Sequence, residues 1–349
     1  MSSGIGIWYL RTVLKGLQLR LDHLKTWLST TDPLPGGKLT LASGDASFRR
    51  YFRLQSDVGS FIIMDAPPEK EDSLPFIRVA GYLEAMQLNA ARVIDADTEL
   101  GFLRLTDLGD TQYLDALEAD EDRAAELYTD AMQALATMQR RGTAYQSQLP
   151  PYDEDLLRFE LALFRDWLCG TYLRIPFSDD DEQRWQSVCD LLVRNALDQP
   201  QVFVHRDYHS RNLMVTAGNN PGILDFQDAV EGPLTYDIVS LLKDCYIKWP
   251  AERVLAWAFE FRDMLPVALQ QQVDENQFLK HFELMGVQRH LKAAGIFARL
   301  NLRDGKPGYM ADVPRALSYI VDIAPRHEAL QPLLELIQAR VLPGLEALR

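Results

Sequence analysis

The sequence predicts an α+β protein with two lobes, a small β-rich N-terminal lobe and a large α-rich C-terminal lobe. Three observations lead to this fold class. The chain has 349 residues, more than twice the roughly 150 residues typical of one domain. Alternation of apolar and polar residues, which is typical of strands, dominates up to about residue 108. Helical periodicity dominates from about residue 111, with one short β segment embedded in it.

The chain begins with a predicted amphipathic helix, an extension over residues 1–30. The prediction rests on one apolar seam, in which leucines recur at alternating spacings of four and three residues. The seam consists of Leu10, Leu14, Leu17, Leu21, Leu24 and Leu28. Such a seam predicts a helix packed on the body of the protein or on a second copy, and a helix lying on a membrane surface is the alternative. The stretch DPLPGG, residues 32–37, ends the helix.

Residues 31–108 form the predicted N-terminal lobe. Residues 38–66 have strand patterns, with a hairpin loop over 43–47 and a third strand over 60–67 that ends in two prolines. A helix carrying Glu84 is expected over 73–88, and two further strands over 91–97 and 100–106. In the second strand, Phe48, Arg50 and Phe52 share one face, while Arg49 shares the opposite face with other polar residues.

Residues 109–349 form the predicted C-terminal lobe. Helices are expected over 123–141, 153–172, 180–197, 234–249, 251–273, 276–302 and 328–346. Three short strands are expected among them, over 201–207, 212–215 and 222–226.

Composition excludes several classes of function. The net charge of −14 disfavours a nucleic-acid binder, which needs a basic surface. Three widely spaced cysteines without a CxxC pattern argue against a disulfide framework or a zinc site, and so favour the cytoplasm. No apolar run approaches the roughly 18 residues of a membrane span, and the N-terminus lacks the pattern of a secretory signal.

The motif that carries chemistry is VHRDYHSRNLMV followed by GILDFQD. Asp207 and Asn212 are five residues apart, and Asp225 follows 13 residues later at the end of a strand. Phosphoryl transfer needs a carboxylate to accept the proton of the attacking hydroxyl, and hard oxygen ligands to hold Mg²⁺ against nucleotide phosphates. Asp207 fits the first role and Asn212 with Asp225 the second. His205 is interpreted as a structural residue of this loop.

These residues, with Phe226, resemble the aminoglycoside phosphotransferase and choline kinase family, which has a protein-kinase-like fold. The segments LASGDASFRRYFRL, IMDAPPE and DFQDAVEGPLTYDIVSLLKD look like those of a cell-wall sugar kinase in that family. The resemblance covers about residues 20–340. It implies ATP and Mg²⁺ as cofactors, with ATP between the lobes, and it implies that Asp237 steadies the catalytic loop. Capping of the helix that Asp237 opens is the alternative role.

The resemblance also implies where the nucleotide binds. The loop of Ser43, Gly44, Asp45, Ala46 and Ser47 would cover the phosphates, and the connector around Leu105 would present its backbone to adenine. Kinases usually carry a lysine on the third strand. None occurs here between Gly59 and Pro68, so Glu84 lacks its usual partner. Arg50 is the predicted substitute, provided that the apolar face of its strand lies over the nucleotide.

The resemblance implies that the acceptor is a small amino sugar phosphorylated on its anomeric hydroxyl. The late helix carries basic residues on one side, which favours a neutral or anionic acceptor over a polycation, although a solvated helix face would have the same pattern. The candidate substrate contacts are His209, Asp228, Glu231, Arg289 and Lys292. A kinase for antibiotics, choline or another small alcohol is the first alternative function, and a pseudokinase-like nucleotide-binding module is the second. The sequence leaves the oligomeric state open.

Overall fold

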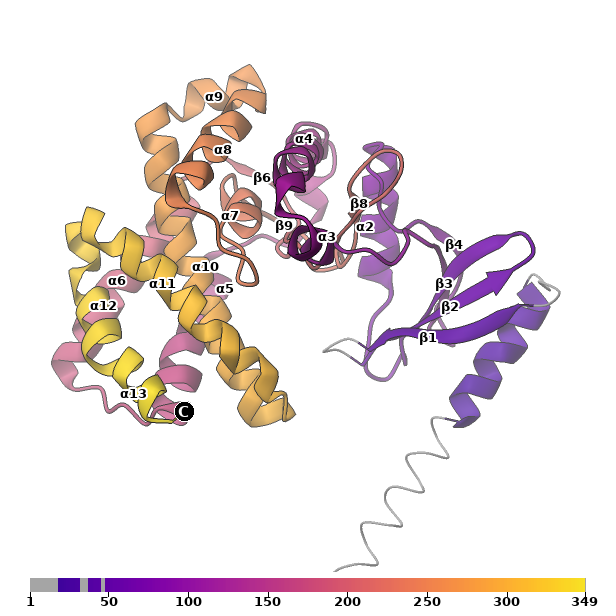
Figure 1. Ribbon diagram of the computed structural model, residues 1–349, viewed down its shortest axis with the longest axis horizontal. Helices are drawn as coiled ribbons and strands as arrows, with labels where there is room; N and C mark the ends of the chain where they lie inside the picture. The colour runs from indigo at the N-terminus through magenta and orange to yellow at the C-terminus, as the bar shows by residue number, and fades with distance from the viewer. Residues whose placement is uncertain (1–17, 32–36, 45–47, 349) are drawn as a thin grey trace, which may run out of the picture. The chain divides into compact units, whose positions relative to one another are not determined.

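A computed structural model describes residues 18–31, 37–44 and 48–348 (Figure 1). Its described residues form two compact units, one up to Glu84 together with Ala90–Leu108, and the other comprising Ala85–Asn89 and the chain from Gly109 onward. The first contains a sheet and two helices, and the second is mainly helical, which confirms the predicted α+β fold class. Residues 1–17 of the predicted N-terminal helix (1–30) and loop residues 45–47 lie outside the described residues.

The first unit is built on an antiparallel sheet of five strands in the order β1-β2-β3-β5-β4. The strands are β1 (Lys38–Gly44), β2 (Arg50–Ser56), β3 (Gly59–Asp65), β4 (Val93–Asp97) and β5 (Phe102–Thr106). Phe52 lies opposite Ile63 and Arg50 opposite Asp65, so these four side chains share a face. All five strands fall where the alternating pattern predicts them.

The helix over residues 18–31 packs on that face of the sheet. Its apolar seam buries Leu24 and Trp27 against Phe52, Leu54 and Phe102, among other residues. A polar contact fixes the same helix, because the Arg20 Nε donates to the buried carboxylate of Asp65 at 2.6 Å. The described part of the predicted extension is therefore part of the core of this unit.

One further helix of the first unit, α2 (Leu74–Ala85), follows the sheet strands β1–β3 in sequence. Its buried residues are Phe76, Val79, Ala80 and Leu83, the spacing of one helical face. Glu84 lies near its end and pairs with Arg92 at 3.4 Å, with both side chains more than half exposed. Glu84 thus lies at the surface of the unit, where an ion pair contributes little.

The second unit contains most of the helices. They are α3 (Tyr113–Ala119), α4 (Ala124–Gly142), α5 (Glu154–Leu163) with its π-helical continuation η3 (Phe164–Tyr172), α6 (Asp179–Leu197), α7 (Tyr236–Leu242), α8 (Ala251–Met264), α9 (Val267–Gln272), α10 (Glu275–Asp304), α11 (Val313–Ile323), α12 (Gln331–Leu336) and α13 (Leu342–Ala347). The predicted helix over 251–273 is two helices, since Pro266 separates α8 from α9. Helices α3 and α11 were not predicted.

The 30-residue helix α10 is the central element of the second unit. It packs against α5, α6, α7 and α11 (Figure 1). Gly295 permits a close approach to the junction of α5 and η3, because a Cβ there would overlap the backbone of Leu163 and Phe164. This close crossing brings polar side chains of α10 and α5 together in the interior.

Short strand pairs hold the loops that carry the chemical motif. β6 (Gln201–Val204) pairs with β9 (Val230–Pro233), and β7 (Leu213–Met214) pairs with β8 (Gly222–Ile223). The loop over 205–212 runs from β6 to β7, and the loop over 224–229 runs from β8 to β9. Strand β9 was not predicted. Both motif loops are thus anchored at each end by a hydrogen-bonded strand.

Candidate active site

The two motif loops bring Asp207, Asn212 and Asp225 together. The Asn212 side-chain amide donates to the backbone carbonyl of Asp207 at 3.0 Å and to the Asp225 carboxylate at 3.2 Å. The other Asp225 oxygen accepts from the Gln227 amide at 2.9 Å. One asparagine therefore ties the candidate base to the candidate metal ligand within the same unit.

Two non-glycine residues of these loops adopt the left-handed backbone conformation. The φ angle is 77° at Arg206 and 60° at Asp225. Such conformations are costly for residues with a Cβ, and they persist where the surrounding structure fixes them, often at functional sites. Here they turn the chain at the residue before Asp207 and at Asp225 itself.

Buried polar groups hold the first loop in this shape. The Asp237 carboxylate accepts from the backbone amides of His205 at 2.6 Å and Arg206 at 2.9 Å. The His205 Nδ1 accepts from the backbone amide of Asp207 at 3.3 Å. Burial lowers the pKa of His205 to about 4, so its ring is neutral and able to accept that bond. Both residues thus act on the backbone around Asp207.

The electrostatic surroundings keep Asp207 ionised. Burial raises its pKa, but the nearby charges of Lys292, His209 and Arg289 lower it to a net value of about 2. Asp207 is therefore a carboxylate at neutral pH, the form that can orient a hydroxyl and accept its proton.

A buried polar network lies beside this loop, centred on Glu160 of α5. The Glu160 carboxylate is 2% exposed and accepts from four side chains of three different parts of the chain. These are Tyr152, Arg206, Gln288 and Lys292. The Lys292 Nζ also donates to the Tyr236 hydroxyl at 2.8 Å. Arg206 and Lys292 thus share one carboxylate as their ion-pair partner.

Glu160 is a site residue that the sequence analysis missed. It precedes Asp207 by almost fifty residues and belongs to no local motif. One signal was available, because it lies beside Leu157 and Leu161 on the buried face of α5. A charged residue on an apolar helical face is rarely buried unless it is paired. Ser210 and Asp244 form another missed pair, in which Asp244 accepts from the Ser210 backbone amide at 2.9 Å.

Arg289 lies next to this network but is bonded differently. Its Nη2 donates to the backbone carbonyl of Arg206 at 3.3 Å, and its guanidinium carbon lies 4.9 Å from the centre of the Tyr236 ring. Among the described residues, no carboxylate forms an ion pair with it. Arg289 therefore contacts the residue that immediately precedes Asp207.

The other predicted substrate contacts lie in different surroundings. The His209 ring lies edge-on to Tyr246, with 5.4 Å between centroids. Asp228 accepts from its neighbour Gln227 at 3.4 Å. Glu231 lies in β9, and its carboxylate accepts from Gln146 at 2.9 Å. His209 is thus beside an aromatic wall, whereas Glu231 is engaged within the fold.

The predicted nucleotide contacts belong to the first unit. Ser43 and Gly44 end β1, and Asp45, Ala46 and Ser47 lie outside the described residues. Leu105 lies within β5, opposite Ile62 on one side and Val93 on the other. Leu105 is therefore already paired with a neighbouring strand on each side, and β5 ends one residue later.

Arg50 is bonded to Asp65 through its Nε at 3.0 Å and also through its Nη2. The face it shares with Phe52 is the one that the helix over 18–31 covers. The condition for Arg50 to reach a nucleotide, that this apolar face lies over adenine, is therefore not met by the described residues. Arg49 pairs with Glu71 at 3.1 Å.

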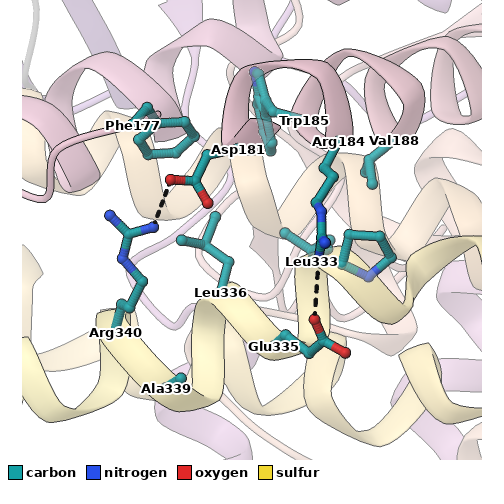
Figure 2. A pocket seen from close by; sticks show the side chains of 11 residues that line it. Phe177, Asp181, Arg184, Trp185, Val188, Leu333, Glu335, Leu336, Ala339 and Arg340 are labelled. Carbon is teal, nitrogen blue, oxygen red and sulfur yellow. Dashed lines mark hydrogen bonds and ion pairs between the residues drawn. The ribbon is translucent and has the colours of Figure 1, made fainter. Parts of the chain in front are cut away.

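A separate cavity of about 170 Å³ lies in the second unit, between α6 and the segment from α12 to residue 340. Figure 2 shows its apolar wall, which includes Trp185 and Leu336, and two ion pairs at its edge, Asp181 with Arg340 and Arg184 with Glu335. None of the predicted site residues lines it. The candidate active site is therefore the pair of motif loops.

Comparisons with known proteins show the family to which the chain belongs. The sequence model of the "Phosphotransferase enzyme family" matches residues 38–269. A curated relative from Pseudomonas aeruginosa, named N-acetylmuramate/N-acetylglucosamine kinase, is 44% identical over 94% of this chain and 98% of its own length. This confirms the resemblance to a cell-wall sugar kinase.

Solved structures share the fold. An ethanolamine kinase from Plasmodium vivax has a TM-score of 0.62 and 12% identity, covering 91% of this chain and 89% of its own. The GDP complex of aminoglycoside 2′-phosphotransferase-IIIa has a TM-score of 0.58 and 15% identity, covering 85% and 98%. At these identities the likeness concerns the fold, which confirms the protein-kinase-like class.

Proposed function

Because this chain belongs to the phosphotransferase enzyme family, we propose that it transfers the terminal phosphoryl group of ATP to the anomeric hydroxyl of N-acetylmuramate and N-acetylglucosamine. The products would be the sugar 1-phosphates, and the role would be in peptidoglycan recycling. The single observation that carries the proposal is the convergence of Asp207, Asn212 and Asp225. The name of the curated relatives supports the choice of sugars.

In this proposal, Asp207 orients the anomeric hydroxyl and accepts its proton as the oxygen attacks phosphorus. The bond from phosphorus to the leaving oxygen of ADP breaks as the bond to the sugar oxygen forms. Asp207 suits this role since it is ionised and partly exposed, on a loop fixed by Asp237 and His205. General-base assistance of this kind typically contributes 10²–10⁴-fold to rate.

Asn212 and Asp225 would hold Mg²⁺. The Asn212 amide nitrogen donates to the Asp225 carboxylate at 3.2 Å, and the carboxylate and the oxygen of the same amide are hard donors of the kind that this ion prefers. Among the described residues, no cluster of three or more His, Cys, Asp or Glu side chains forms a closed metal site. A site with few protein ligands fits Mg²⁺, which usually keeps waters and substrate phosphates as further ligands. When bound, the ion would neutralise charge on the nucleotide phosphates.

The nucleotide would bind through the first unit, as the family resemblance implies. Residues Ser43–Ser47 and the chain around Leu105 remain the proposed contacts. Arg50 stays the proposed phosphate contact, but it would have to leave its bond with Asp65. Comparing the KM for ATP of Arg50→Met and Arg49→Met tests this assignment, since only the former should raise it markedly.

A cytoplasmic location completes the proposal. The three cysteines are free thiols, as expected in a reducing compartment that also supplies ATP. No helix of the described chain is long and apolar enough to cross a membrane.

The test is ATP consumption with a panel of acceptors. We expect ADP release with N-acetylmuramate and N-acetylglucosamine, and little with kanamycin or choline. ADP release with only an aminoglycoside or choline would replace the proposed substrate. Nucleotide binding without turnover on any acceptor would favour the binding-module alternative.

A further inference from the structure

Arg289 is a buried cation that no carboxylate of the described chain bonds directly. Its residue is 8% exposed, and its Nε has no hydrogen-bond partner. Its Nη2 donates to the backbone carbonyl of Arg206 at 3.3 Å, and Asp207 acts on its charge without an ion pair between them. A buried donor without an acceptor is costly, so the site is suited to a bound anion that supplies one.

The nearby carboxylates have other partners. Glu160 pairs with Arg206 and Lys292, and Asp237 accepts two backbone amides. Asp207 is the proposed base. Lys292, one turn along α10 from Arg289, is therefore held by an ion pair, whereas Arg289 has no ion pair among the described residues and keeps an unbonded Nε for a ligand.

The position of Arg289 indicates which ligand group it meets. It bonds to the residue immediately before Asp207, and the acceptor hydroxyl must lie against Asp207. The other substituents of the acceptor sugar then lie in the same region as Arg289. N-acetylmuramate differs from N-acetylglucosamine by a lactyl ether on carbon 3, which ends in a carboxylate.

Resting on the function proposed above, we propose that Arg289 binds the carboxylate of the acceptor sugar acid and sets the preference for N-acetylmuramate over N-acetylglucosamine. Arginine suits this task because its planar guanidinium matches a carboxylate with two parallel hydrogen bonds. The other anion that reaches the site is the transferring phosphoryl group, which both sugars share. Comparing the two sugars therefore distinguishes the two anions.

The experiment measures kcat/KM for three acceptors with the wild-type protein and with Arg289→Met. The acceptors are N-acetylmuramate, its neutral methyl ester and N-acetylglucosamine. We expect Arg289→Met to lower kcat/KM for N-acetylmuramate about 10–100-fold more than for N-acetylglucosamine, the usual range for a hydrogen bond to a charged group. With the wild-type protein, the methyl ester should lack the part of kcat/KM that the carboxylate contributes. Arg289→Met should leave kcat/KM for the ester unchanged. Arg289→Lys, which keeps the charge, should recover part of the preference.

Lys292→Met is the matched control, since it removes a cation of the same helix that is ion-paired with Glu160. It should leave the ratio between the two sugars unchanged. An equal loss on both sugars in Arg289→Met would overturn the proposal and place Arg289 at the phosphoryl group or at the base. Unchanged kcat/KM for both sugars in that variant would also overturn it. If the wild type phosphorylates neither sugar, the proposed function itself fails, and this inference fails with it.

Discussion

Asp207 is held in place by its own backbone and its neighbours rather than by its side chain. The amide of Asp207 donates to His205, and its carbonyl accepts from Asn212. Replacing the carboxylate should therefore leave the loop in place. We expect Asp207→Asn to lower kcat about 10²–10⁴-fold with ATP binding retained. Steady-state kinetics at saturating sugar provide the test, and a variant that keeps more than about a tenth of wild-type kcat would show that Asp207 is not the base.

The proposed metal ligands should differ in their effects. Asp225 supplies a charged carboxylate and Asn212 a neutral amide, and the carboxylate contributes more to a divalent site. Asp225→Ala should abolish activity, whereas Asn212→Ala should raise the Mg²⁺ concentration that activity requires. Titration of activity with Mg²⁺ measures both. A structure with nucleotide and Mg²⁺ in which both side chains lie away from the metal would contradict the assignment.

His205 should make stability depend on pH. Its pKa is about 4 in the folded protein, against 6.5 when exposed, because burial disfavours the charged ring. Between these values the unfolded chain binds more protons, so stability falls as pH decreases from 6.5 to 4. The shift corresponds to about 3 kcal/mol.

The variant His205→Asn should have a shallower loss of stability across this window than the wild type, measured by denaturant unfolding at several pH values. The pKa of Asp237, which burial raises to about 7, acts in the opposite direction in both proteins. Its effect therefore cancels in the comparison. Identical slopes would mean that His205 is not buried in its neutral form.

At the level of elements, the helix over 18–31 stabilises the first unit. Leu24 is fully buried against the sheet, whereas Leu19 of the same helix is 58% exposed. Leu24→Ala should lower the free energy of unfolding by about 2–5 kcal/mol, the usual range for a core leucine. Leu19→Ala is the matched control, and we expect it to change stability by no more than about 0.5 kcal/mol. Equal effects would show that the helix does not pack as described.

The same helix explains why the sequence alone could not show what covers the face of β2 that carries Arg50. Alternation correctly places Arg50 and Phe52 on one face of β2. Which face of β2 meets a ligand depends on which other element packs against the strand. The apolar seam of a helix does not reveal the surface against which that helix packs. In the structure the partner is this sheet face, through Leu24 and Arg20.

Elements were predictable where the signal was long or local. Strands β1 to β5 and helix α10 follow from periodicity. Strand β9 (Val230–Pro233) escaped because it has four residues and a proline at its end, and its pairing with β6 is set by tertiary structure. Helix α11 has a proline as its second residue, which suggests a break in the sequence pattern, although Pro in a first helical turn is compatible with the helix.

At the scale of the whole molecule, the spacing of Asp207, Asn212 and Asp225 made the catalytic loops recognisable. These residues lie within 19 positions of sequence, on loops between short strands. The network around Glu160 was not recognisable, because α5 and α10 supply residues that are far apart in sequence, such as Glu160 and Gln288 with a separation of 128 residues. Its formation depends on the close crossing at Gly295, which the local pattern does not reveal.

The central claim is that this chain phosphorylates the anomeric oxygen of an amino sugar. Phosphorus NMR of the product formed from N-acetylglucosamine and ATP tests it most directly. We predict a phosphorus signal coupled to the proton on carbon 1, and loss of that product when the protein carries Asp207→Asn. A phosphorus signal coupled instead to the protons on carbon 6, or the same 1-phosphate formed at an undiminished rate by Asp207→Asn, would contradict the account.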